Sequence, residues 1–306
     1  MQSIINYIKH PSSLLDSLVR HFGQFLSDRT YIKLRFRLQM GKRLNLKNPK
    51  TFQEKIQWLK LYNYNPNYTK MVDKVLVKEY VSSIIGSEYV IPILGVWDEP
   101  ESINWDILPN RFVLKTNHGG GNSGVVVCRD KNNFDYQKAK LQLSKSLHND
   151  IYRNMREWPY KNIRKCVFAE EYVEIDSTVK DLPDYKWYCF NGEPMYCQVI
   201  KNRTTNETID FFDKEWHHQD FIGLNPLAHN SSQEILRPSN LELHIKIAKK
   251  LSKSIPFCRV DLYDTGSKVY FGEITFFPAS GVGFFKPEKY DEILGSLLTL
   301  PNQNYR

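Results

Sequence analysis

Two short runs near the C-terminal end of the chain carry residue types that bind metal ions and phosphate. They are Arg259-Val260-Asp261 and Glu273-Ile274-Thr275. Alternate residues of a β-strand share a face, so Arg259 and Asp261 should point the same way, as should Glu273 and Thr275. If the connecting loop has an odd number of residues, both carboxylates lie on one face. That oxygen-rich set suits Mg²⁺, and Arg259 could neutralise a transferring phosphate. The alternative is a solvent-facing polar strand. The apolar flanking residues favour a central strand, where unpaired carboxylates would be costly.

A glycine-rich segment follows Lys115. Glycine lets backbone N–H groups approach an anion closely, and Lys115 can place a cation beside it. A flexible hairpin tip would also be rich in glycine. An apolar run at 125–128 follows the loop, so the pattern predicts a strand–loop–strand lid over phosphates rather than a strand-to-helix phosphate loop. No HRD or DFG motif is present, which excludes a protein kinase. The candidate phosphate-binding residues are Lys115, Gly119, Gly120, Gly121, Ser123 and Gly124.

A third group of candidates lies in two further apolar runs. Glu170 or Glu171, at the end of one run, could accept hydrogen bonds from an adenine amino group or ribose hydroxyls. Lys186, within an aromatic run, can reach phosphate oxygens. Weaker candidates for holding an anionic substrate are Lys201, Arg203 and the loop residue His118, each of which could equally be an ordinary polar residue.

The elements that must position these residues are predicted from periodicity. Residues 1 to about 90 read as helices, including one that begins after Thr51 with capping-box spacing to Glu54 and one from Met71 to about Ile85. Strands are expected at 89–97, 111–116, 125–128, 166–173, 185–190, 195–200, 257–263 and 268–275, with helices at 135–156 and 240–253. Asn191-Gly192 predicts a hairpin turn. The fold class is therefore α+β with mostly antiparallel strands.

Composition limits the classes of protein. The 306 residues include 42 Lys and Arg against 34 Asp and Glu, a net charge of +8, and 41% are hydrophobic. The hydrophobic content indicates a folded protein. The excess of basic residues indicates either an anionic partner or simply a basic surface, and the second alternative stays open because the lysines are dispersed along the sequence. The five cysteines lack metal-binding spacing and are expected to be reduced. No secretory leader or membrane-spanning run is evident, which predicts a cytoplasmic protein with at most peripheral contact at the inner face of the membrane. The first helices could form an amphipathic anchor or, more commonly, pack on their own domain.

The order of these motifs resembles that of the ATP-grasp superfamily, and more narrowly the TupA-like ATP-grasp family of polysaccharide and teichuronopeptide gene clusters. The resemblance covers about residues 40 to 290. It is carried by Leu46–Lys60, Val72-Asp73-Lys74, Phe112–Lys115, Leu182–Lys186 and Gly272–Pro278. It implies an ATP-grasp domain at 69–306, with a lid at about 88–165 and a core at about 166–300, after a helical segment at 1–68.

The resemblance also implies roles for single residues. Lys74, Lys115 and Lys186 match nucleotide-contacting lysines, residues 119–124 match the lid loop, and Glu170 or Glu171 matches the adenine hinge with Val173 as its backbone contact. Asp261 and Glu273 match Mg²⁺ ligands, and Arg259 matches an arginine near the acyl phosphate. Thr275 departs from the asparagine that many superfamily members carry, so it is the least certain metal ligand.

The implied activity is ATP- and Mg²⁺-dependent ligation of a carboxylate to an amine through an acyl phosphate, in cell-surface glycan assembly. Such chemistry needs no protein nucleophile, in keeping with the lack of a Ser/His/Asp or Cys/His arrangement. Two other classes stay open. A glycosyltransferase would need a nucleotide-sugar site, and no DxD motif is present. A basic module for nucleic acid or membrane would show steep salt dependence, but the retained Lys115, Lys186, Asp261 and Glu273 argue against a degenerate ATP site.

Overall fold

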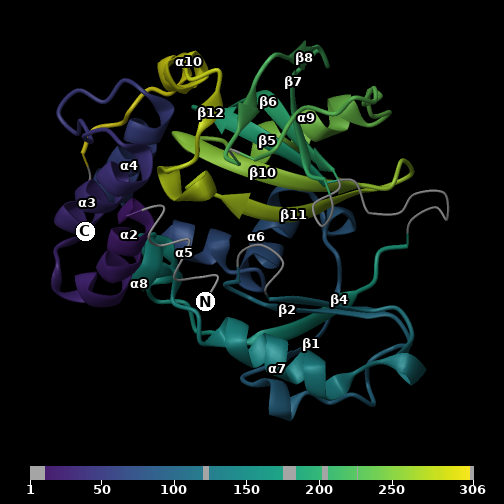
Figure 1. Cartoon of the computed structure of the whole chain (residues 1–306). Helices are drawn as coiled ribbons and strands as arrows, with labels where there is room; N and C mark the ends of the chain where they lie inside the picture. Colours follow the sequence, from purple (N-terminus) through teal and green to yellow (C-terminus); the bar gives the residue numbers. More distant parts are fainter. Residues whose placement is uncertain (1–10, 120–123, 175–183, 202–205, 226, 304–306) are drawn as a thin grey trace.

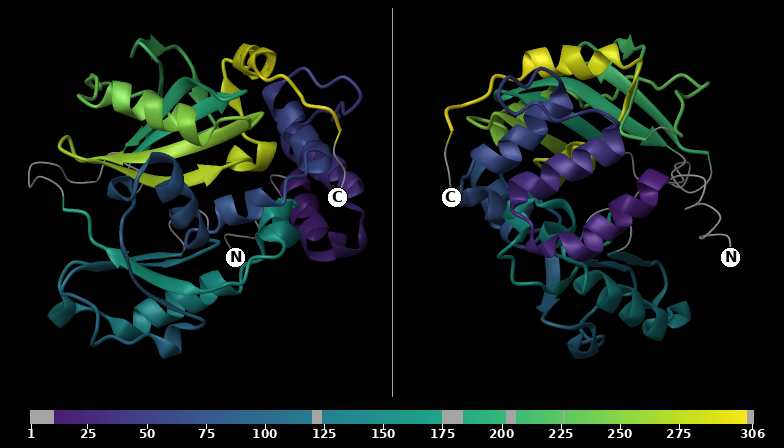
Figure 2. Two further views of the ribbon diagram at one scale, coloured as in Figure 1. Left: turned by 180° about the vertical axis from the view of Figure 1, so that it is seen from behind. Right: turned by 60° about the vertical axis from the view of Figure 1, so that its left-hand side comes forward.

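The computed structural model describes residues 11–119, 124–174, 184–201, 206–225 and 227–303. Two β-sheets lie in separate lobes, with the helices of residues 11–62 grouped at one side of both (Figures 1 and 2). The α-helices are α2 (Pro11–Phe22), α3 (Asp28–Met40), α4 (Phe52–Tyr62), α5 (Asn67–Val72), α6 (Leu76–Ile85), α7 (Tyr136–Leu147), α8 (Ile151–Met155), α9 (Leu241–Leu251) and α10 (Lys289–Leu297).

The larger sheet has the order β11-β10-β5-β6-β7-β8, and the smaller has the order β1-β4-β2-β3. Every strand pair in both is antiparallel, which confirms the α+β class. The strands are β1 (Ile93–Trp97), β2 (Phe112–Thr116), β3 (Val125–Cys128), β4 (Val167–Glu171), β5 (Asp184–Phe190), β6 (Glu193–Lys201), β7 (Thr208–Asp213), β8 (His218–Gln219), β9 (Ile222–Gly223), β10 (Phe257–Asp264), β11 (Val269–Thr275) and β12 (Phe285–Lys286).

One face of the large sheet carries both the main aromatic core and the polar candidates. Phe52, at the start of α4, packs its ring 4.9 Å from that of Phe257 in β10. Arg259 and Asp261 lie on the same face as Phe257 because they follow it by two and four residues along the strand. The other face is covered by α9, where Ala248 contacts Cys189. The N-terminal helix α4 is thus built into the core of the large lobe, while the predicted division at residue 68 stays a prediction.

The small sheet presents two unlike faces. Phe112 and Leu114 are buried with Leu143 of α7 in a separate hydrophobic cluster. The residues that alternate with them, including Lys115, point toward the large lobe. Since Lys115 pairs with Phe168 and Val113 with Glu170 in the β2–β4 ladder, Glu170 lies on that same face. The side chains of Lys115 and Glu170 therefore point into the space between the lobes.

Several local expectations are confirmed and others are wrong. Thr51 and Glu54 form the capping box, Asn191 and Gly192 both have positive φ in the β5–β6 turn, and all five cysteines are free and buried. The expected helix at 71–85 is interrupted at Asp73, and the one at 135–156 divides into α7 and α8. Among the residues described, no helix is long and apolar enough to cross a bilayer.

Candidate functional site

The two C-terminal motifs face each other across neighbouring strands. In the β10–β11 ladder Asp261 pairs with Glu273 and Arg259 with Thr275. In the β5–β10 ladder Lys186 pairs with Asp261. Directly paired residues of antiparallel strands share a face, so three strands present these five side chains together.

A β-bulge produces this alignment. The loop between Asp264 and Val269 has four residues, an even number, and an unbroken ladder would therefore place Gly272 opposite Asp261. The register instead shifts by one residue between Asp261 and Leu262, which pairs with Phe271. Gly272 is the extra residue, and a Cβ on it would lie 3.0 Å from the Asp261 carbonyl oxygen. The bulge thus moves Glu273 onto the face of Asp261.

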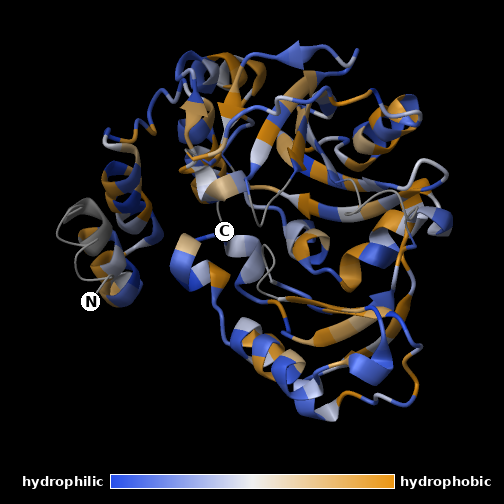
Figure 3. Ribbon diagram, turned by 45° about the vertical axis from the view of Figure 1, so that its right-hand side comes forward, coloured by the Kyte–Doolittle hydropathy of each residue, from blue (hydrophilic) through white to orange (hydrophobic). Residues whose placement is uncertain are grey.

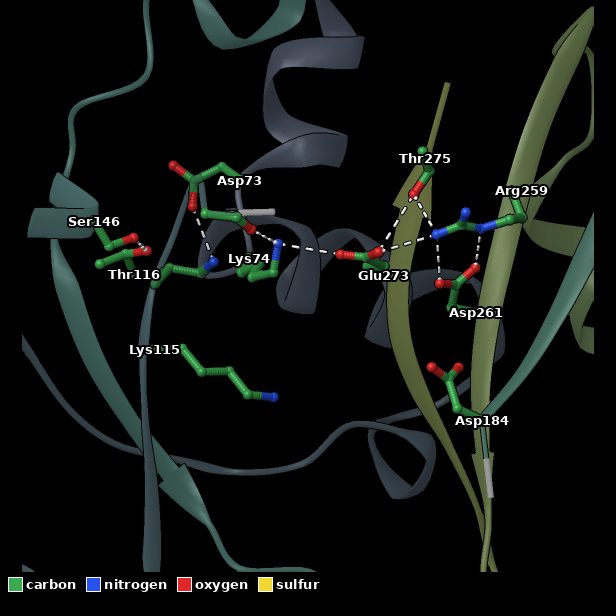
Figure 4. A network of polar contacts seen from close by, with 12 residues as sticks. Asp73, Lys74, Lys115, Thr116, Ser146, Asp184, Arg259, Asp261, Glu273 and Thr275 are labelled. Carbon is green, nitrogen blue, oxygen red and sulfur yellow. Dashed lines mark hydrogen bonds and ion pairs between the residues drawn. The ribbon is translucent and has the colours of Figure 1, made fainter. Parts of the chain in front are cut away.

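The side chains form a dense charged network (Figure 4). Arg259 donates from Nε to Asp261 Oδ1 at 2.6 Å and from Nη2 to Asp261 Oδ2 at 2.8 Å. Nη2 also lies 3.2 Å from Glu273 Oε1 and from Thr275 Oγ1. Lys186 bridges Asp261 and Asp184, 2.7 Å from the latter. Asp184 was not among the expected residues.

The surroundings shift the pKa values of the two carboxylates in opposite directions. Burial raises the pKa of Asp261, although Arg259 and Lys186 act against it. For Glu273 burial also favours protonation, but Lys74, Arg259 and Lys186 outweigh it and hold the pKa well below its usual range. Glu273 is therefore a permanent carboxylate at neutral pH.

Lys74 connects this network to the glycine-rich loop. Its Nζ lies 3.2 Å from Glu273 Oε2 and donates to the Gly119 carbonyl at 2.7 Å. The break between α5 and α6 positions it, because Asp73 Oδ1 accepts hydrogen bonds from the amides of Val75 and Leu76, where α6 begins. Asp73 Oδ2 accepts from Asn117 at 2.9 Å, which fixes the break against the loop.

The two ends of the glycine-rich loop pack closely against the small lobe. A Cβ at Gly119 or Gly124 would collide with Thr116 Oγ1, so both positions require glycine. Thr116 Oγ1 contacts Ser146 Oγ of α7 at 2.8 Å. The predicted residues Gly120, Gly121 and Ser123 lie outside the described residues.

Lys115 and Glu170 form the opposite wall. Lys115 extends from β2 toward the strands of the large sheet (Figure 4) and pairs with Glu170. Glu170 also accepts from Lys78 at 2.8 Å. Burial acts to raise the pKa of Glu170, but the two lysines hold it below its usual value. A pocket between the sheets is lined by Lys74, Lys78, Ile91, Lys115, Phe168, Glu170, Tyr263, Phe271 and Gly272.

Lys78 is a pocket residue that sequence reasoning missed. It lies four residues after Lys74, a spacing that would place both side chains on one face of the helix expected at 71–85, although Lys74 itself lies in the break before α6. That spacing was the available signal.

The remaining candidates lie at or after the ends of strands. Glu171 is exposed at the end of β4 and Val173 follows it, at the start of the connection to β5. Lys201 is exposed at the end of β6, and Arg203 lies outside the described residues. His118 is 2% exposed and contacts Asn149 O at 3.2 Å. Burial, with Lys165 nearby, lowers its pKa to about 4, so it is neutral.

The segment after Thr275 is held by α4, a link the sequence did not reveal. Ala279, Ser280 and Gly281 all have positive φ, of 45°, 54° and 65°. Gln57 donates to Ser280 O at 2.9 Å and to Gly281 O at 2.7 Å. Buried Lys60 donates to Ser280 O at 2.7 Å and lies 2.6 Å from its hydroxyl. This left-handed turn thus depends on polar groups of the N-terminal helices.

Comparison with known proteins gives the family. Residues 54–299 match the family model described as TupA-like ATPgrasp. Because the match spans most of the chain, this protein belongs to the TupA-like ATP-grasp family, as the sequence motifs indicated. No curated protein matches it.

Solved structures provide more distant similarities. D-alanine–D-alanine ligase from Bacillus anthracis is 17% identical, with a TM-score of 0.42, over 74% of this chain and 62% of that one. The Helicobacter pylori ligase is 14% identical, with a TM-score of 0.44, over 81% and 69%. The ATP-grasp ligase PsnB, complexed with minimal precursor, Mg and ADP, is 11% identical, with a TM-score of 0.38, over 87% and 66%. The chain thus spans less than two thirds of the first ligase.

Proposed function

We propose that this protein is an ATP-dependent ligase that joins a carboxylate to an amine, with Mg·ATP bound between the two sheets. The observation that carries the proposal is the direct pairing of Asp261 with Glu273 beside Arg259, facing Lys74 at the end of the glycine-rich loop. Family membership supports it. We further propose that the carboxylate belongs to a uronic acid or acidic peptide of a cell-surface glycan and that the amine comes from an amino acid.

The charge balance of the cleft suits a nucleotide. The cationic side chains around it are Lys74, Lys78, Lys115, Lys186 and Arg259, and the carboxylates are Glu170, Asp184, Asp261 and Glu273. Each of these lysines forms an ion pair with a carboxylate that lines the cleft, so the cations are already oriented before a phosphate binds. A polyphosphate would bring the acceptor oxygens that such lysines bind.

The residues also fit a magnesium ion. Within the described ranges no cluster of three or more His, Cys, Asp or Glu side chains is arranged to hold a metal. Mg²⁺ does not need one, since it binds through one or two carboxylates with phosphate and water. Asp261 and Glu273 would hold it, with the Thr275 hydroxyl 3.4 Å from Glu273 Oε1. The ion would supply positive charge at the transferring phosphate.

In the proposed reaction a substrate carboxylate oxygen bonds to the γ-phosphorus as the bond to the β-phosphate oxygen breaks and ADP leaves. The amine nitrogen then bonds to the acyl carbon, phosphate departs with the acyl oxygen, and the amine loses a proton. Arg259 and Lys186 stabilise the charge on the transferring group, while Lys74 and Lys115 hold the nucleotide from the other side. Catalysis rests on positioning and electrostatics.

The test is ADP release with Mg·ATP and a panel of uronic acids and amino acids. Parent protein is compared with Glu273→Gln, which keeps the shape of the side chain, and with Glu215→Gln, an exposed control on the β7–β8 connection. We expect release that depends on both substrates and falls at least about 100-fold in Glu273→Gln only. Nucleotide binding without ADP release from any carboxylate–amine pair would refute the ligase activity. Binding of a UDP-sugar instead would favour a glycosyltransferase, and salt-sensitive polyanion binding without nucleotide would favour a binding module.

A further inference from the structure

Helix α2 is oriented with its apolar face outward. Leu15, Leu18 and Phe22 recur at helical spacing and are 50%, 44% and 64% exposed. The inward face instead carries Asp16, which is buried and accepts from Arg35 Nε at 2.8 Å. Gly23 is also inward, because a Cβ there would lie 2.7 Å from the Tyr31 ring. A helix of a soluble protein usually shows the reverse pattern.

The exposed apolar surface continues past the helix. Phe25 is 87% exposed, and Leu26 and Leu34 are each 37% exposed. Single exposed apolar residues are ordinary, but a contiguous group on one element marks an interaction site. We name Leu15, Leu18, Phe22, Phe25 and Leu26 the apolar ridge. The helix pair that bears it lies at the outer edge of the molecule, away from the space between the sheets (Figure 3).

The helix pair and the ten residues after it carry an excess of basic side chains. Residues 11–50 contain nine Lys and Arg and only two acids, a net charge of +7, whereas the whole chain carries +8. Both acids are engaged internally, Asp16 by Arg35 and Asp28 by Arg156. This segment is therefore rich in basic residues and poor in acids, whereas the other 33 Lys and Arg are distributed over the rest of the chain.

Three of these basic residues form a stripe on α3. Arg29, Lys33 and Arg37 are exposed and lie four residues apart, so they follow one face of the helix.

We propose that the α2–α3 pair docks the protein on an anionic phospholipid surface. The apolar ridge would enter the boundary between headgroups and acyl chains, and the basic residues would contact lipid phosphates. Nucleic acid would leave the ridge exposed. A second copy would bring two segments of positive net charge together, which opposes association. A lipid surface is the partner that complements both features. The site is separate from the nucleotide cleft, so the proposal is independent of the ligase activity.

The test measures partition of the full chain onto vesicles of phosphatidylcholine alone or with a quarter phosphatidylglycerol, by sedimentation. The ridge variant is Leu15→Ser/Leu18→Ser/Phe22→Ser. Its matched control is Ile107→Ser/Leu141→Ser/Leu227→Ser, whose parent residues are 56%, 57% and 90% exposed elsewhere on the protein. The charge variant is Arg29→Gln/Lys33→Gln/Arg37→Gln, and its control is Lys246→Gln/Lys250→Gln/Lys253→Gln, at exposed lysines of α9 and the residues after it.

We expect binding to the anionic vesicles at least about tenfold tighter than to neutral ones. The ridge variant should lose at least about tenfold, the charge variant about 100-fold, and both controls should stay within about twofold of the parent. Circular dichroism checks that each variant is folded.

Three outcomes would overturn the proposal. One is equal binding by parent and ridge variant, or none by either. Another is a dimer of the parent, seen by sedimentation velocity, that the ridge variant abolishes, since a second copy would then cover the ridge. The third is vesicle binding that appears only after residues 2–10 are removed, since that segment would then be the occupant.

Discussion

Lys186→Met should damage both folding and nucleotide binding, by two mechanisms that can be separated. Lys186 is 5% exposed, and its Nζ bridges Asp184 and Asp261. The methionine keeps much of the buried volume but removes the positive charge and three donors. Asp261 retains both hydrogen bonds from Arg259. Asp184 is therefore the carboxylate that the loss of the Lys186 charge affects most.

The magnitude follows from these contacts. Removing one partner of a buried ion pair typically costs about 3–5 kcal/mol, because the other charge stays buried. Since Arg259 still compensates Asp261, we expect the low end, about 3 kcal/mol of unfolding free energy. Adding Asp184→Asn removes the carboxylate and should restore most of this loss. Neither change returns a cation to the phosphates, and a lost charge-assisted hydrogen bond of about 1.5–3 kcal/mol weakens ATP binding roughly 10- to 150-fold.

The assay combines urea unfolding with calorimetric titration of Mg·ATP, on Lys186→Met, the double variant and the exposed control Lys214→Met. We expect Asp184→Asn to rescue stability while ATP affinity stays low in both variants. Parent-like ATP affinity in either variant would show that Lys186 does not contact the nucleotide. A double variant as unstable as the single one would show that the Asp184 carboxylate is not the cause.

Three further predictions concern the supports of the site. Burial lowers the pKa of Lys60 to about 8, from an ordinary value of 10.5. Between these two pH values the folded state binds fewer protons than the unfolded state, so the free energy of unfolding should rise with pH. Lys60→Met should lack that rise when its free energy of unfolding is measured in urea at pH 7.5 and 10. Gly281→Ala places a Cβ at positive φ and 2.7 Å from Gln57 Nε2, which should cost about 3 kcal/mol and lower the thermal midpoint; an unchanged midpoint would mean that the turn relaxes freely. Gly272→Val places a Cβ 3.0 Å from the Asp261 carbonyl oxygen and so disfavours the bulge; an unbroken ladder would turn Glu273 to the opposite face of the sheet and abolish Mg·ATP binding in calorimetry, whereas retained binding would contradict the assigned role of the bulge.

Local sequence rules predicted what depends on near neighbours. The capping box at Thr51 and the turn at Asn191-Gly192 follow from contacts within a few residues. The break before α6 was missed, because it depends on Asp73 bonding Asn117, 44 residues away. The role of Lys60 was missed for the same reason, since its partner Ser280 is 220 residues distant. An exposed ridge on α2 was equally hidden, because periodicity gives an apolar face but not the direction in which it points.

The pairing of Asp261 with Glu273 shows where pattern reasoning reaches its limit. Strict alternation along the two strands places Asp261 and Glu273 on one face only if the hairpin loop has an odd number of residues, and this loop has four. By that rule alone Glu273 would share the face of Val260 and lie on the side of the sheet away from Lys186. Gly272, the extra residue of the bulge, brings Glu273 to the face of Asp261. A glycine is suited to the bulge because the Asp261 carbonyl and the Tyr263 ring approach it closely. The carboxylate pair therefore depends as much on this glycine as on the two acids, and the glycine immediately before Glu273 is the sequence signal that could have predicted the bulge.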